Sequence, residues 1–215
     1  MNPCPAPPLT LPEELLLLGL DPVRGRPLVT RPFLRYGLAG AALADLEAAG
    51  RIVEQGGRVA VARPLPLGDP VLDGALAALP GPDKHHKGVR AQRWVRRTGG
   101  TVHELCVRQL EGRGAIRREA RRALGLFPYE RFPTGPVDLA GPARARFKAA
   151  LDAGLPDPRT RALAALAAAC DLDRKLLPGN GHRAARRGLR RLARAEWPAH
   201  AVERVVREDK SAAAG

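Results

Sequence analysis

Arginines at helical spacing are the side chains of this 215-residue chain best suited to bind a ligand. On a helical wheel at about 100° per residue, six of those between His182 and Ala195 fall within an arc of roughly 140°. They are Arg183, Arg186, Arg187, Arg190, Arg191 and Arg194. Leu189 and Leu192 lie opposite them, so the segment predicts a basic amphipathic helix that suits anionic lipid or nucleic acid. The same pattern also fits the solvated outer face of a bundle helix.

A second candidate surface combines apolar residues with arginines. The run Leu124-Gly125-Leu126-Phe127 follows Arg117, Arg118, Arg121 and Arg122. Apolar side chains at a loop tip are able to enter a bilayer while the arginines hold lipid headgroups. The alternative is a loop that folds its apolar residues back onto the core.

Signals for catalysis or metal binding are weak. The sequence has no P-loop, GxSxG or HExxH motif. His85 and His86 lie in a basic segment without nearby cysteines, which favours a solvated loop over a metal site. Helix capping explains Asp69 and Asp73 better than paired acid–base catalysis does. We therefore expect a protein that is not an enzyme and uses no metal or cofactor.

Composition limits the class of protein and its compartment. The formal net charge of +14 favours polyanionic partners, although Arg, Ala, Gly and Pro are also the residues that a GC-rich genome encodes often. Three widely spaced cysteines without a CxxC motif indicate a reducing compartment. No apolar run approaches the roughly 20 residues of a membrane-spanning helix. These features predict a cytoplasmic protein that is able to lie on a membrane without crossing it.

The elements that must position these residues are mostly short helices, because Leu and Ala dominate and aromatic residues make up only 4%. In Leu9–Asp21, Thr10 and Glu13 form a capping box ahead of consecutive leucines, so this helix must be buried. Further helices are predicted at Pro32–Ala49, Thr101–Gln109, Pro142–Ala153, Thr160–Leu177 and Trp197–Arg207. A short helix that ends at Leu79 is predicted after the turn at Gly68-Asp69-Pro70. A hairpin is predicted at Arg51–Ala62, a loop or second hairpin at Arg117–Pro133, and a basic linker at Asp83–Arg97.

Together these elements predict a mainly α fold. We expect a single-domain helical bundle over residues 9–208, with a central buried helix and peripheral β-hairpins. Residues 1–8 are predicted to be a disordered tail and residues 209–215 a frayed one.

In the order and spacing of several short motifs, the chain resembles a bacterial form of the Golgi phosphoprotein 3 family. The matching pieces are Leu9–Asp21, Gly37–Leu43, Gly50-Arg51-Ile52, Pro66–Asp73, Trp94, Leu110–Ile116, Asp157–Thr160 and Trp197. The resemblance implies a mainly helical domain with β-hairpins. It also implies a peripheral membrane protein that recognises phosphatidylinositol 4-phosphate.

The resemblance also suggests where the lipid would bind. The pocket Trp and the three pocket Arg of the family map close to Thr30 and onto Ala39, Gly100 and His103. Nearby basic residues are therefore the expected headgroup ligands, namely Arg31, Arg35, Arg96, Arg97 and His103. The membrane-inserting loop of the family maps onto Leu124, Leu126 and Phe127.

The expected partner is the anionic inner face of the membrane, bound reversibly. The resemblance implies that eukaryotic members bind cytoplasmic tails of glycosyltransferases, a role that is not carried over to a bacterial form. A scaffold that binds membrane-protein tails through an acidic motif is a further expected class. The alternative is a winged-helix-like nucleic-acid-binding protein, with a helix, a Gly cap and a wing in Ala42–Ala62. A recognition helix needs polar residues for base edges, but Ala39, Gly40 and Ala41 stand there instead.

Overall fold

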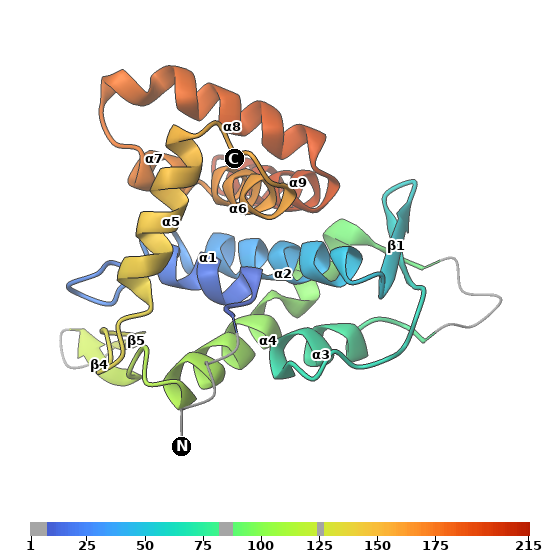
Figure 1. Cartoon of the computed structure of the whole chain (residues 1–215), viewed down its shortest axis with the longest axis horizontal. Helices are drawn as coiled ribbons and strands as arrows, with labels where there is room; N and C mark the ends of the chain where they lie inside the picture. The colour runs from blue at the N-terminus through green and yellow to red at the C-terminus, as the bar shows by residue number, and fades with distance from the viewer. Residues whose placement is uncertain (1–7, 82–87, 124–126) are drawn as a thin grey trace.

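The computed structural model describes residues 8–81, 88–123 and 127–215, without the side chains of 122, 123, 127 and 128. Its helices are α1 (Leu11–Gly19), α2 (Arg31–Ala48), α3 (Pro70–Ala77), α4 (Ala91–Gly112), α5 (Ala140–Asp152), α6 (Pro158–Ala169), α7 (Asp173–Leu176), α8 (Arg183–Ala195) and α9 (Trp197–Ala212), with a 3-10 turn at Asn180–His182. One antiparallel sheet has the order β1 (Ile52–Gln55), β2 (Arg58–Val61), β3 (Val89–Arg90), and a hairpin pairs β4 (Glu119–Ala123) with β5 (Phe127–Arg131). Figure 1 shows a helical bundle with the small sheets at its edges, which confirms the mainly α prediction.

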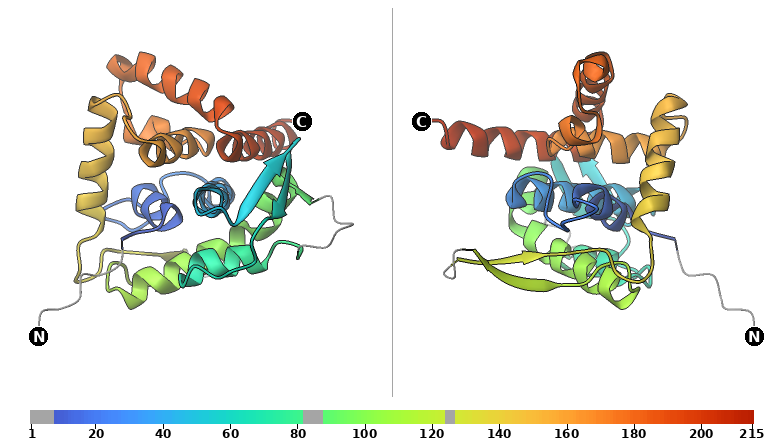
Figure 2. Two further views of the ribbon diagram at one scale, coloured as in Figure 1. Left: turned by 45° about the vertical axis from the view of Figure 1, so that its right-hand side comes forward. Right: turned by 90° about the vertical axis from the view of Figure 1, so that its left-hand side faces the viewer.

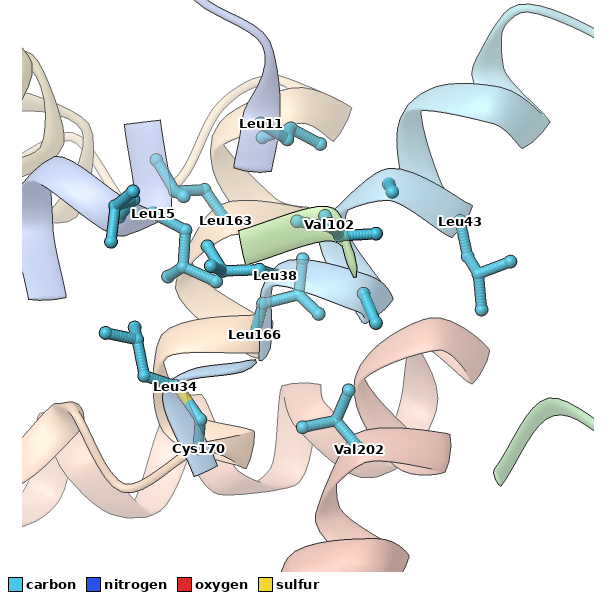
Figure 3. Close-up of a cluster of buried hydrophobic side chains, with 14 of the residues drawn as sticks. Leu11, Leu15, Leu34, Leu38, Leu43, Val102, Leu163, Leu166, Cys170 and Val202 are labelled. Atoms are coloured by element: carbon cyan, nitrogen blue, oxygen red, sulfur yellow. The ribbon is translucent and has the colours of Figure 1, made fainter. Parts of the chain in front are cut away.

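The centre of the bundle is α2, which packs against α1, α4, α6 and α9. Every residue of α2 from 37 to 43 is buried. Leu38 lies among Leu15, Val102 and Leu166, each from a different helix, in the cluster of Figure 3. Small residues on α2 let the neighbouring helices approach closely, and the apolar area that they bury together is the main stabilising contribution.

The first helix has the predicted capping box. The Glu13 amide donates to Thr10 Oγ1, and the Thr10 amide donates to Glu13 Oε2 at 2.8 Å. All nine residues of α1 are buried, which confirms the interpretation of its consecutive leucines. Burial raises the pKa of Glu13, and its carboxylate lies 3.4 Å from Arg113 Nη1. Helix α1 therefore supports the interior and ends at the loop that leads into α2.

Three elements differ most from the sequence prediction. The linker prediction was wrong for Ala91–Arg97, because α4 begins at Ala91 and buries Trp94 and Val95. The helix predicted at 160–177 is interrupted, since Asp171 has a positive φ of 65° between α6 and α7. Helix α9 runs on to Ala212, beyond the expected end at Arg207. In α4 the arginines between the apolar positions hid the helical period.

A close crossing of α2 and α4 sets the geometry of the surface described next. At Gly99 an added Cβ would lie 2.8 Å from the backbone oxygen of Arg35. No larger residue fits there without moving one of the two helices. The crossing brings the first two turns of α2 beside the middle of α4.

Candidate anion-binding face

Three of the predicted headgroup residues lie near the crossing of α2 and α4. Arg31 and Arg35 are four residues apart on α2 and so share a face, while His103 is on α4. Burial, followed by the positive charge of Arg35, lowers the pKa of His103 to about 4, and Arg31 acts in the same direction. We call Arg31, Arg35 and His103 the α2–α4 basic cluster.

The imidazole of His103 is the buried member of this cluster. It is 8% exposed, and its ring meets Phe132 edge-on with the centroids 5.7 Å apart. A neutral imidazole offers one donor and one acceptor. Arg35 is half-buried, and its Nε is buried without a hydrogen-bond partner in the described part of the chain. The cluster therefore holds an unsatisfied cationic donor beside a neutral histidine.

The cluster lies at the foot of the β4–β5 hairpin. Arg31 Nη2 donates to the backbone oxygen of Glu130 at 2.9 Å. Arg26, in the loop before α2, donates to the Tyr129 hydroxyl at 3.0 Å and lies over its ring. These contacts attach the beginning of α2 to β5. Figure 2 (right) shows the hairpin and the end of α9 projecting to the same side of the molecule.

Three acidic residues neutralise Arg118, which lies on the same side. Arg118, immediately before β4, binds Glu104 at 2.9 Å and lies 3.6 Å from both Glu111 and Glu130. Its charge contributes to the lowered pKa of His103. Arg118 was missing from the predicted ligands, and only its position in an arginine run ahead of the hairpin signalled it.

Two predicted headgroup residues have other contacts. Arg96 binds Glu208 at 3.1 Å and also Asp209, and it lies over the ring of Tyr36. The hydrogen bond to Asp209 raises the pKa of Arg96. Arg97 lines a separate pocket near the beginning of α4. Of the five residues, three thus form the α2–α4 basic cluster, Arg96 is paired with acidic residues of α9, and Arg97 faces another pocket.

The predicted membrane-inserting loop lies at the tip of the hairpin. Leu124 and Leu126 are outside the described residues. Phe127 begins β5, where it pairs with Ala123, and its side chain is not described. The second hairpin is confirmed as β4–β5, while insertion of its tip into a bilayer stays a prediction.

The predicted amphipathic helix is α8, on the outside of the bundle. Leu189 and Ala193 are buried, and α8 packs against α6 and α9. Arg186, Arg190 and Arg194 bind carbonyl or carboxylate oxygens. Arg183, Arg187 and Arg191 are exposed and make no ion pair within the described ranges; we call them the α8 basic face. Figure 1 shows α8 at the top and β4–β5 at the lower left, so the two surfaces are separate.

Groups that would support other chemistry are few in the described part of the chain. No described cluster of three or more His, Cys, Asp or Glu side chains is arranged to hold a metal ion. Cys106 and Cys170 are fully buried, and burial raises the pKa of the Cys170 thiol to about 12. Such a thiol is not ionised at neutral pH and is a poor nucleophile. Among the described helices, none is long and apolar enough to cross a membrane.

These features define a mainly helical single domain with a basic cluster at the foot of a projecting hairpin. Residues 11–208 match the family model described as Golgi phosphoprotein 3 (GPP34). The chain belongs to this family, as its motifs predicted. The comparison with curated proteins gives no match.

The buried imidazole gives a test of this geometry. His103 has a pKa of about 4 in the fold against 6.5 when unperturbed, so the unfolded chain binds its proton first as the pH falls. The contribution of neutral His103 to the free energy of unfolding is therefore present above pH 6.5 and is lost as the pH falls towards 4. Between pH 7.5 and pH 5 the loss is about 2 kcal/mol. Urea unfolding of wild type and His103→Gln at both pH values measures it. Equal pH dependence in the two proteins would contradict the burial of a neutral His103.

Proposed function

We propose that this protein is a non-enzymatic peripheral membrane protein that binds anionic phospholipid through the α2–α4 basic cluster. Phosphatidylinositol 4-phosphate or another phosphoinositide-like lipid is the proposed ligand, and the inner face of the cell membrane is the proposed location. The observation that carries the proposal is the meeting of Arg31, Arg35 and neutral His103 at the foot of the hairpin. Membership of the Golgi phosphoprotein 3 family supports a membrane-related role.

The chemistry of the cluster suits a phosphate group. Arg35 has a buried Nε donor without a partner, and Arg31 lies one turn away. Guanidinium groups bind phosphate oxygens through paired, charge-assisted hydrogen bonds. His103, neutral at physiological pH, supplies a further donor without repelling the arginines. A bound phosphate would thus satisfy groups that the fold leaves open.

Binding of this kind is weak and reversible. Each arginine near an anionic surface contributes about 1 kcal/mol, and the contribution falls within about 10 Å at moderate salt. Insertion of the hairpin tip would add an apolar contribution on the same side. Membrane-protein tails, the second proposed class of partner, would be met at the same surface.

The nucleic-acid alternative has less support. The helix that would have to read bases is α2, and Ala39, Ala41 and Ala42 are 0% exposed within the bundle. A recognition helix must present polar side chains to a groove. Helix α2 therefore does not suit the role of a recognition helix ahead of the strands β1 and β2.

Vesicle co-sedimentation at low salt tests the proposal. We expect binding to vesicles of phosphatidylcholine with phosphatidylinositol 4-phosphate, and Arg31→Gln/Arg35→Gln should weaken it about 10- to 30-fold, since two arginine contributions are lost. The matched control is Arg187→Gln/Arg191→Gln, which removes the same charge at the same spacing from the α8 basic face. It should change binding by less than about threefold.

Other results of the same experiment decide against parts of the proposal. No binding of wild type at low salt would reject lipid binding altogether. A larger loss in the α8 variant would move the site to the other surface. Unchanged binding by Phe127→Asp would remove the hairpin tip from the contact. Vesicles of phosphatidylglycerol at matched charge measure whether the 4-phosphate itself is recognised.

A further inference from the structure

A second basic site lies at the other side of the molecule, where the β1–β2–β3 sheet meets the beginning of α4 (Figure 1). A pocket of about 540 Å³ opens there, within the range of small-ligand sites. Four arginines line it, namely Arg58, Arg90, Arg93 and Arg97. Leu79, Val89 and Trp94 form part of the remaining wall. None of its described lining residues is acidic. The definition of the site does not include residues 82–87.

The four arginines are arranged as two pairs of like charge. Arg58 and Arg90 are directly opposite each other on β2 and β3, a placement that destabilises a sheet. Arg93 and Arg97 are four residues apart on α4, where like charges repel in the same way. Arg58 Nη1 donates to the Gly88 oxygen at 2.9 Å. Within the described residues no carboxylate lies within ion-pair distance of any of the four.

The positive end of a long helix adds to this charge. Helix α4 has 22 residues, begins at Ala91 and has no acidic residue in its first turn. Arg90 is the N-cap residue and makes no side-chain capping bond, and Arg93 follows in the first turn. Positive side chains are unfavourable at a helix N-terminus, whereas phosphate groups are favourable there. The arginine pair on the strands, the arginine pair on α4 and the N-terminus of α4 thus all contribute positive charge to one pocket.

A buried donor in the pocket wall also lacks a partner. Trp94 is 2% exposed, and its indole Nε1 makes no hydrogen bond to any residue that the structure describes. Indole N–H is a donor only, and leaving it buried and unpaired costs free energy. An acceptor oxygen of a ligand that reached Nε1 would satisfy it. The repulsion between the arginines, the helix dipole and this donor all favour a ligand with negatively charged acceptor oxygens.

We propose that this pocket binds a small ligand carrying two or more adjacent phosphate groups. Adjacent phosphates carry enough negative charge to pair with four guanidinium groups, and Arg fits phosphate oxygens two at a time. A soluble nucleoside diphosphate and a phosphorylated lipid headgroup share this chemistry. The pocket is separate from the α2–α4 basic cluster and does not depend on it.

Calorimetric titration of the whole chain with inorganic pyrophosphate tests the proposal. Wild type should bind one equivalent at this site, and Arg93→Gln/Arg97→Gln should weaken binding at least tenfold. Arg204→Gln/Arg207→Gln is the matched control, because both arginines are exposed on α9 and make no ion pair with described residues. The control should change the affinity less than twofold. No binding by wild type, or an equal loss in both variants, would overturn the site.

Trp94 supplies an internal reporter. The chain has two tryptophans, so in Trp197→Phe the fluorescence comes from Trp94 alone and should change on adding pyrophosphate. Trp94→Phe keeps an aromatic side chain but removes the indole N–H, and it should weaken pyrophosphate binding severalfold. Because the smaller ring also lowers the stability of the fold, the affinity is measured at a temperature at which the variant is fully folded. Pyrophosphate should raise the melting temperature of wild type and leave that of Arg93→Gln/Arg97→Gln unchanged. Binding without a change in Trp94 fluorescence would place the anion elsewhere.

Two further arms identify the source of the phosphates. For a soluble ligand, ADP competes with pyrophosphate and vesicle binding is unaffected by Arg93→Gln/Arg97→Gln. For a lipid headgroup, pyrophosphate releases the protein from vesicles of phosphatidylinositol 4,5-bisphosphate, whose two ring phosphates are adjacent, and the same variant loses binding to these vesicles. Either result retains the site and assigns its ligand. Arg31→Gln/Arg35→Gln should keep full pyrophosphate affinity, so failure of the lipid-binding proposal is distinguishable from failure of this one.

Discussion

Arg190→Leu should destabilise the fold by about 3 kcal/mol at neutral pH. The carboxylate of Asp173 is 0% exposed, and Arg190 Nε lies 2.9 Å from its Oδ2. The other oxygen, Oδ1, is already buried without a partner among the residues that the structure describes. Removing the arginine would leave a buried charge with no compensation, and Arg190 is itself partly exposed, which keeps the expected loss at the lower end of the usual range. Urea unfolding at pH 7 measures it.

A second substitution separates the buried charge from the loss of packing. Asp173→Asn in the Arg190→Leu background removes the unpaired charge and should recover part of the lost stability. Arg191→Gln, at the next position on the solvent side of α8, should leave the urea midpoint unchanged. If the double variant is as unstable as Arg190→Leu alone, the loss comes from packing of the arginine stem and not from the charge.

The sequence predicted the elements whose signals are local. Thr10 and Glu13 are three residues apart, so their capping box was readable without knowledge of the fold. The two glycines between β1 and β2 identified the first hairpin for the same reason. The beginning of α4 was missed because Trp94 and Val95 are embedded among arginines, and only burial against other elements shows the apolar face.

Features of the candidate sites depend on segments that are distant in sequence. The low pKa of His103 arises from burial together with Arg35 and Arg118, and no pattern near His103 predicts these neighbours. Arg58 and Arg90 meet because β3 pairs with β2, and β3 is two residues long. Residue types therefore indicated an anion-binding protein, whereas only the packing shows which arginines are neutralised and which are available.

Two adjacent glycines of α4 should respond to alanine in opposite directions. At Gly99 the new Cβ would lie 2.8 Å from the backbone oxygen of Arg35, which cannot rotate away. Gly99→Ala should therefore destabilise the protein by about 1–3 kcal/mol. At Gly100 an added Cβ meets nothing within 4 Å. Gly100→Ala should stabilise by about 0.5–1 kcal/mol, since alanine is the better helix former. Thermal and urea unfolding of both variants measure the difference.

The same pair of variants connects the fold to the proposed lipid site. A shift of α2 against α4 at Gly99 would separate Arg35 from His103, so Gly99→Ala should raise the pKa of His103 towards 6.5 as their repulsion and the burial decrease. A titration of the His103 ring protons by NMR reports this, and Gly100→Ala serves as the control with an unchanged pKa. Vesicle binding should fall in Gly99→Ala even where the variant is fully folded. Normal binding with a shifted His103 pKa would mean that Arg31 and Arg35 act without the histidine, and the headgroup contact would then belong to α2 alone.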